Sequence, residues 1–216
     1  KGGIRAIIKI KGKMAHGAMP LTGVNPNPRM ASLILKLGEL EQKVGRLGPH
    51  KYLGYPSITP TVVMSPPNGK GQLNVVPEES LIGLDIRTIP GQDDEALIYL
   101  IEGLFEELKS SDDKFRAEME VIERRPCTHT DKNELIVRAM DGAYKTITGK
   151  EPIYNGVLGA TDGTFLWAWK HIPVVVTGSG RREVPHQRDE YVEIDQLIET
   201  TKIYTQAIVN YLFADE

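Results

Sequence analysis

The chain is poor in cysteine and has no long apolar run. Cys127 is its single cysteine among 216 residues, which excludes an internal disulfide and favours a reducing compartment such as the cytoplasm. No apolar run approaches the roughly 18 residues of a membrane span, so no membrane partner is expected. Basic stretches with interleaved aromatic residues are also missing, and 26 basic against 29 acidic side chains give a formal net charge of -3. Nucleic acid is therefore not an expected partner.

The sequence also lacks an initiator methionine and a signal peptide at its start. It opens with Lys1-Gly2-Gly3-Ile4 and enters a β-rich run at once, which is typical of the interior of a longer polypeptide. With 40% hydrophobic and 25% charged residues, the composition is that of a globular protein. The length allows one large domain or two small ones.

Strand-like and helix-like patterns alternate over residues 1–124. The strand-like runs are 4–11, 58–65, 80–88 and 115–123, and the helix-like runs are 30–44 and 97–108. Asp93 is the expected N-cap of the second helix. This order, β-α-β-β-α-β, predicts an α+β ferredoxin-like domain with two helices on one face of a four-stranded antiparallel sheet. The first and third strands should be central, which leaves a free polar face with Asp85 and Arg87 to line a cleft.

Residues 125–216 predict an incomplete α/β portion. A first helix, marked by Leu135 to Ile147, should end at Gly149, and two further helical runs follow. The apolar run Val174-Val175-Val176 is typical of a short strand that is buried on both faces. Two short strands cannot form a stable open sheet unaided, so this portion needs neighbours that the chain does not supply.

Five local patterns carry the candidate chemistry. They are Gly12 to Pro20 (GKMAHGAMP), Asn74 to Pro77 (NVVP), Asp85 to Arg87 (DIR), Gly159 to Gly163 (GATDG) and Pro185 to Glu190 (PHQRDE). No single pattern is specific. Taken alone, His186 is typical of a solvated loop histidine, because a catalytic zinc site needs about three protein ligands and no other His, Asp or Glu stands at a recognisable ligand spacing.

In this order, the five patterns resemble the two-metal, zinc-dependent family of amidohydrolases and exopeptidases. That family includes acetylornithine deacetylase, succinyl-diaminopimelate desuccinylase, glutamate carboxypeptidase, aminoacylase and archaeal carboxypeptidases. The resemblance covers essentially the whole chain. It implies a lid (dimerisation) domain at residues 1–124 and the C-terminal portion of a catalytic domain at residues 125–216.

The resemblance implies roles for three residues of the lid. His16 would reach the active site of the partner subunit and polarise the scissile carbonyl group; alone, it is typical of a solvated turn histidine. Asn74 would hydrogen-bond the substrate, whereas the alternative is a turn cap on its own backbone. Arg87 would grip the carboxylate of the substrate with a bidentate fork, and the alternative is a surface ion pair with Asp85.

The second portion holds further candidates. Thr161 precedes Asp162-Gly163 and would line the substrate pocket, unless Asp162 serves only as a helix N-cap. The backbone N–H groups of Gly178, Ser179 and Gly180 would contact an anion, or the segment is only a flexible connector.

Two more residues of this portion bear on metal and specificity. His186 corresponds to the last metal ligand of the family. Thr164 stands where the desuccinylases carry an arginine, which argues against their diacid specificity.

The resemblance places the other metal ligands and the general base before the lid. We therefore expect a parent enzyme that hydrolyses an amide bond of an N-acyl amino acid or a peptide with a free carboxylate, through a metal-activated water. The implied cofactor is zinc, two ions per active site, with cobalt or manganese as alternatives, and the implied assembly is a homodimer through the lid. The chain itself should be inactive. The alternative is a non-catalytic dimerisation or interaction module, in which His16 and Arg87 are ordinary surface residues.

Overall fold

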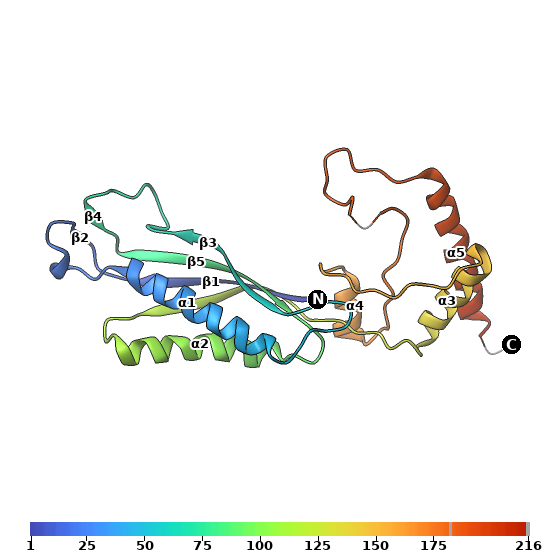
Figure 1. Ribbon diagram of the computed structural model, residues 1–216, viewed down its shortest axis with the longest axis horizontal. Helices are drawn as coiled ribbons and strands as arrows, with labels where there is room; N and C mark the ends of the chain where they lie inside the picture. Colours follow the sequence, from blue (N-terminus) through green and yellow to red (C-terminus); the bar gives the residue numbers. More distant parts are fainter. Residues whose placement is uncertain (182, 215–216) are drawn as a thin grey trace. The chain divides into compact units, whose positions relative to one another are not determined.

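The computed structural model describes residues 1–181 and 183–214 and divides them into two compact units (Figure 1). Unit 1 contains Lys1–Cys127 together with Leu158–Ala160. Unit 2 contains Thr128–Val157 and the described residues from Thr161 onward. No helix among the described residues is long and apolar enough to cross a membrane.

Unit 1 is built on a four-stranded antiparallel sheet. Its strands are β1 (Gly2–Lys11), β3 (Ser57–Met64), β5 (Glu79–Thr88) and β6 (Ala117–Arg125), in the spatial order β3-β5-β1-β6. As the sequence predicts, β1 and β5 are central and the other two strands are edges. Helices α1 (Pro26–Gly45) and α2 (Asp94–Ser111) interrupt the strands at the predicted places.

The core of unit 1 lies between the sheet and its two helices. Alternate residues of the central strands point toward the helices, so their apolar side chains are removed from water. These are Ile4, Ile8 and Ile10 on β1 and Ile82, Leu84 and Ile86 on β5, which pack with Leu33 and Leu37 of α1 and Leu97 and Ile101 of α2. The predicted cap of α2 is confirmed, because the Asp93 carboxylate accepts hydrogen bonds from the backbone N–H groups of Glu95 and Ala96.

A small second sheet stands beyond one end of the central strands. It pairs β2 (Ala15–His16) with β4 (Val75–Val76), and the 3-10 turn η1 (Pro20–Thr22) follows β2. Strands of two residues leave no alternation that a sequence could show. The pairing forms because β1 and β5 run side by side and release the two segments at the same end of the sheet.

The last strand of unit 1 differs from its predicted bounds. It begins at Ala117 and ends at Arg125, two residues later than expected at both ends. A register shift opposite Arg5 and Ala6 of β1 places one extra residue in β6. Beyond this bulge the alternation is reset, so that Glu123 lies opposite Arg5 and Arg125 lies opposite Gly3.

Unit 2 consists of α3 (Leu135–Thr148), α4 (Gly163–Lys170), α5 (Ile194–Leu212) and the segments between them. Helix α3 packs on α5 around Ala143, Ile203 and Ala207. Gly149 closes α3 in the left-handed conformation, with φ 68°, as predicted from its position.

The strand predicted at residues 174–176 is wrong. The described residues of unit 2 form no strand, and the expected α/β portion therefore contains helices and irregular segments only. A strand needs a neighbouring backbone to satisfy its N–H and C=O groups. Here a side chain takes that place: the Thr130 hydroxyl donates to the Val174 carbonyl oxygen at 2.7 Å and accepts from the Val174 N–H at 3.1 Å.

Candidate active site

The small β2–β4 sheet brings two of the predicted site residues together. His16 lies opposite Val75 in this pairing. The backbone N–H of Gly17 donates to the carbonyl oxygen of Asn74 at 2.6 Å. Both His16 and Asn74 are exposed. In Figure 1, β2 and β4 lie at the tip of unit 1, beyond β1 and β5. Two residues that are far apart in the sequence and carry an imidazole and a carboxamide thus belong to the same end of unit 1.

A hydrogen bond to the ring selects the tautomer of the neutral His16 imidazole. Its Nδ1 accepts the backbone N–H of Ala18 at 3.1 Å. A ring nitrogen that accepts a hydrogen bond carries no proton, so the neutral ring bears its proton on Nε2. His16 therefore offers one N–H donor outward. That is the chemistry that an oxyanion stabiliser needs.

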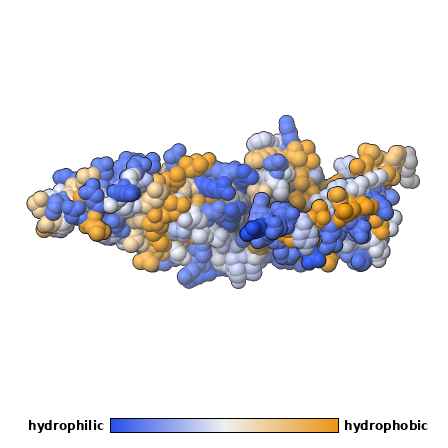
Figure 2. All heavy atoms as spheres, turned by 90° about the horizontal axis from the view of Figure 1, so that it is seen from above, coloured by the Kyte–Doolittle hydropathy of each residue, from blue (hydrophilic) through white to orange (hydrophobic). Residues whose placement is uncertain are grey.

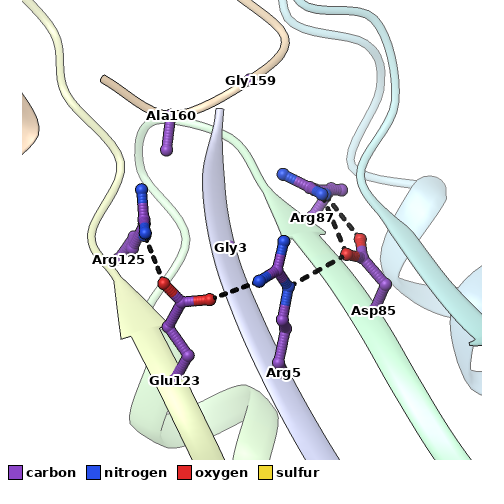
Figure 3. A pocket seen from close by; sticks show the side chains of 8 residues that line it. All are labelled: Gly3, Arg5, Asp85, Arg87, Glu123, Arg125, Gly159 and Ala160. Atoms are coloured by element: carbon purple, nitrogen blue, oxygen red, sulfur yellow. Dashed lines mark hydrogen bonds and ion pairs between the residues drawn. The ribbon is translucent and has the colours of Figure 1, made fainter. Parts of the chain in front are cut away.

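Arg87 lies in a separate pocket, on the sheet face that the helices leave open. The cavity measures about 220 Å³. Its lining comes from β1, β5, β6 and the 158–160 segment: Gly3, Arg5, Asp85, Arg87, Glu123, Arg125, Gly159 and Ala160. Figure 3 shows Asp85 and Arg87 on one side, Glu123 and Arg125 on the other, Arg5 between them, and Ala160 above. The predicted polar cleft on this face is confirmed.

A continuous chain of ion pairs holds the charged side chains of the pocket. Arg87 grips Asp85 in a bidentate pair, Nε to Oδ1 at 2.5 Å and Nη2 to Oδ2 at 2.9 Å. Nε of Arg5 lies 3.7 Å from Asp85 Oδ2, and Nη1 of Arg5 donates to Glu123 Oε2 at 2.8 Å. Nε of Arg125 donates to Glu123 Oε1 at 2.5 Å.

The Arg87–Asp85 ion pair that was the plainer alternative is thus present. It engages one edge of the Arg87 guanidinium group, whereas Nη1 has no partner among the described residues. A guanidinium group presents five N–H donors, so the same side chain can hold Asp85 and a second carboxylate at once. The ion pair and the carboxylate grip are compatible.

The two candidate sites of unit 1 lie at opposite ends of its sheet. Arg87 pairs with the strand near Gly3, whereas His16 follows the other end of β1, beyond Lys11. Because a strand rises about 3.3 Å per residue, the ten residues of β1 separate the two sites by roughly 30 Å. One small substrate cannot contact both within a single chain.

In unit 2, the loop with Gly178, Ser179 and Gly180 is tied to α5. The Gly180 N–H donates to the Gln196 side chain at 3.0 Å, so this donor of the predicted anion nest already has a partner. Gly180 has φ +95°, a conformation that favours glycine.

Thr161 and its neighbours lie at the start of α4. The Thr161 carbonyl oxygen accepts the Thr164 N–H at 3.0 Å, and Asp162 occupies the N-cap position without a side-chain cap hydrogen bond. The Thr164 side chain is buried. A Cβ on Gly163 would lie 2.7 Å from Val174 Cγ1, so glycine there permits the close approach of the two segments.

His186 lies on an exposed turn of unit 2, in the left-handed conformation with φ 67°. Its backbone N–H donates to Glu190 Oε2 at 2.9 Å. Within residues 1–181 and 183–214, no three His, Cys, Asp or Glu side chains gather as a metal-binding group. One imidazole does not form a zinc coordination shell, so the described residues do not fit a zinc ion by themselves.

Arg5, Gly3, Glu123 and Arg125 line the Arg87 pocket, although none of them was predicted from the sequence. Arg5 and Gly3 could have been found, because they share the open face of β1 by alternation. Glu123 could not, since the bulge in β6 reverses the face on which an uninterrupted strand would place it.

Comparison with known proteins gives the family. The model of the peptidase dimerisation domain (M20) matches residues 1–113, which is more than half of the chain. The chain belongs to the M20 peptidase dimerisation family. Two relatives of this M20 chain are named as a desuccinylase and a deacetylase, and both extend well beyond the matched region.

The first relative is a probable succinyl-diaminopimelate desuccinylase from Staphylococcus aureus strain N315. It is 25% identical over 236 residues, which cover 98% of the M20 chain and 56% of the relative. An acetylornithine deacetylase from Myxococcus xanthus is 26% identical over 216 residues, which cover 98% of the chain and 53% of the relative. The chain thus spans about half the length of these proteins.

Solved structures match over both units. An aminopeptidase PepT from Bacillus cereus superimposes with a TM-score of 0.76 at 22% identity, covering 98% of the M20 chain and 52% of the other. An M20 family metallo-carboxypeptidase from Sulfolobus solfataricus superimposes with a TM-score of 0.70 at 20% identity, and the match covers 97% of the M20 chain and 58% of the carboxypeptidase. At these identities the likeness is one of fold.

Proposed function

We propose that the chain is part of a metal-dependent amidohydrolase or exopeptidase that cleaves an amide bond of an N-acyl amino acid or a peptide. Residues 1–124 are its lid, with a ferredoxin-like topology, and residues 125–216 are the C-terminal portion of its catalytic domain. The observation that carries the proposal is the β2–β4 pairing, which holds His16 and Asn74 together at the lid tip in a chain of the M20 peptidase dimerisation family.

His16 and Asn74 act on the substrate at the reacting carbonyl group. The Nε2–H that the Ala18 contact leaves on His16 donates to the carbonyl oxygen as it becomes an oxyanion. The Asn74 carboxamide hydrogen-bonds the bound substrate beside it. Neither group needs to change its protonation state for these tasks.

Arg87 binds the free carboxylate of a substrate, using the edge of its guanidinium group that Asp85 leaves open. The roughly 30 Å between Arg87 and His16 exceeds the length of a small substrate. Each active site therefore takes its Arg87 from one subunit and its His16 and Asn74 from the partner. A homodimer is required for function.

The dimer forms through the edge strand β3. Val62, Val63 and Met64 are 43%, 56% and 42% exposed there, and Figure 2 shows hydrophobic surface over the part of unit 1 that contains β3. An apolar unpaired edge favours pairing with its two-fold mate. The other edge, β6, carries Glu118, Glu120 and further charged residues, which disfavour such pairing.

The catalytic portion contributes further site residues. Thr161 lines the substrate pocket, Gly178 and Ser179 contact an anionic group of the substrate, and His186 is a metal ligand. The Gly180 N–H is already bound by Gln196, so Gly180 shapes this loop and does not contact the anion. The remaining ligands belong to the part of the parent enzyme that precedes the lid. His186 would be the ligand that this chain contributes to two zinc ions, or to cobalt or manganese, and these ions would supply an activated water and positive charge near the reacting carbonyl group. The chain by itself is inactive.

A subunit-mixing experiment on the full-length enzyme tests this proposal. His16→Ala and His186→Ala each inactivate the homodimer, but the mixed dimer holds one site with an intact metal set and an intact visiting histidine. We expect up to half of the wild-type activity per mixed dimer.

Two outcomes would contradict the proposal. Failure of the mixture, with subunit exchange verified by mass spectrometry, would exclude the action of His16 across the dimer. A full-length wild-type protein that hydrolyses no N-acyl amino acid or peptide with zinc, cobalt or manganese would favour a dimerisation module without catalysis.

A further inference from the structure

Arg5 stands beside Arg87 in the open-face pocket but has no part in the proposed function. It lies on β1, opposite Asp85, in the register next to the Gly3–Arg87 pair. Asp85 contacts both arginines, at 2.5 Å to Nε of Arg87 and 3.7 Å to Nε of Arg5. One carboxylate thus ties the two guanidinium groups to the same end of the pocket.

Each of the two arginines keeps donors for a ligand. The described residues engage Nε and Nη1 of Arg5 and Nε and Nη2 of Arg87. Nη2 of Arg5 and Nη1 of Arg87 remain as donors. Figure 3 shows both guanidinium groups beneath the 159–160 segment, on the same stretch of the sheet face.

The floor between the arginines is bare because position 3 is glycine. An added Cβ at Gly3 would lie 3.6 Å from Nη1 of Arg87, which is ordinary van der Waals contact. Alanine therefore fits without strain. The two methyl groups of a valine would reach further, into the space beside Nη1 that a ligand of Arg87 must occupy.

The charge balance of the pocket favours an anion. Its lining carries three guanidinium groups against two carboxylates, an excess of one positive charge. The side chains of Asp85, Glu123 and Arg87 are only 26%, 28% and 30% exposed. Partial removal from water strengthens charge–charge interactions relative to those on an open surface.

We propose that Arg5 is a second substrate-binding residue: Arg5 and Arg87 together clamp one carboxylate over Gly3, and Asp85 positions both guanidinium groups. This inference rests on the proposed function for the identity of the ligand, a substrate carboxylate. It adds that the site is a two-arginine clamp and that the small size of residue 3 keeps it open.

Acetate binding to the 216-residue chain tests the clamp without any catalysis. The chain is used with its N-terminal amine acetylated, because Lys1 precedes Gly3 by only two residues and its α-amino group would add a titrating charge close to the site. Acetate is titrated at constant ionic strength against chloride, with acetamide as the neutral control. The Gly3 amide and the Arg87 Nε–H resonances are followed by NMR.

We expect saturable shifts of both resonances with acetate and none with acetamide. Arg5→Gln should weaken acetate binding about 5- to 10-fold, since it removes a charged donor and the excess positive charge. The matched control is Lys9→Gln, which makes the same charge change on the same face of β1, about 13 Å away by strand rise. It should leave the affinity within about a factor of two.

Gly3 gives a second pair of variants. Gly3→Ala should bind acetate with nearly the affinity of the unmodified chain, whereas Gly3→Val should lower the affinity at least about 10-fold. Both variants should keep the thermal unfolding midpoint of the unmodified chain, because alanine fits without strain and valine suits a strand. Wild-type affinity in Arg5→Gln or in Gly3→Val would overturn the clamp. So would equal losses in Arg5→Gln and Lys9→Gln, or the absence of saturable shifts in the unmodified chain.

The clamp and the proposed function fail in different ways. A full-length enzyme that hydrolyses N-acyl amino acids with the same KM in wild type and Arg5→Gln would refute the clamp and keep the function. Acetate binding that depends on Arg5, in a chain whose full-length protein has no hydrolase activity, would keep the clamp and refute the function.

Discussion

Replacing Val63 on β3 by lysine should dissociate the proposed dimer. Val63 is 56% exposed, so pairing of two β3 edges removes about half of its surface from water. Full burial of a valine side chain contributes about 1.5–3 kcal/mol of stability, so burial of the exposed half of Val63 should stabilise the dimer by about 1 kcal/mol per subunit. Two-fold symmetry doubles the loss to about 2 kcal/mol per dimer, which raises the dissociation constant roughly 30-fold. Two lysines across the axis add charge repulsion.

The matched control is Val121→Lys on the other edge strand. Val121 is 39% exposed and lies opposite Ala6, on the helix side of the sheet, just as Val63 lies opposite Ile82. We expect this variant to keep the wild-type dissociation constant, because β6 takes no part in the dimer.

Sedimentation equilibrium between about 1 and 100 µM measures both variants and the wild type, and thermal unfolding checks that each variant is folded. A dimer through β3 is excluded if the wild-type chain is monomeric at tens of micromolar, or if Val63→Lys and Val121→Lys raise the dissociation constant equally.

Three further predictions concern stability, catalysis and metal. The Arg29 hydrogen bond lowers the pKa of Asp112 below its ordinary 3.8, so this pair stabilises the fold above about pH 4 and the effect is lost as the pH falls further. In denaturant titrations, Asp112→Asn should lower the free energy of unfolding by about 1 kcal/mol at pH 7, and by progressively less as the pH is lowered below about 4. The control Asp113→Asn should have little effect on the free energy of unfolding at any of these pH values. In the full-length enzyme, His16→Ala should lower kcat by about 10² to 10³-fold. Arg87→Ala should mainly raise KM, because the substrate carboxylate is charged in the ground state and in the transition state alike. If steady-state kinetics showed a raised KM for His16→Ala and a lowered kcat for Arg87→Ala, the two roles would have to be exchanged. The 216-residue chain should bind zinc only weakly, since one imidazole is no coordination shell, and a tight stoichiometric site in calorimetry would show that further ligands contribute.

The sequence by itself determined the core of unit 1 and the order of its elements. Period-2 alternation places Ile4, Ile82 and their neighbours on the helix side of the sheet, and it places Arg5 and Arg87 on the other. The Asp93 cap and the Gly149 end of α3 follow from local chemistry in the same way. Signals of this kind are contained within one turn or one strand, so they can be read without knowing the rest of the fold.

Tertiary structure alone decided which site residues meet. His16 and Asn74 come together because two-residue strands pair beyond β1 and β5, and Glu123 faces Arg5 because β6 carries one extra residue. The apolar run at 174–176 has the composition of a strand, yet it forms none among the described residues. A strand exists only where another backbone completes its hydrogen bonds, and the position of that neighbour is a property of the folded chain rather than of the segment.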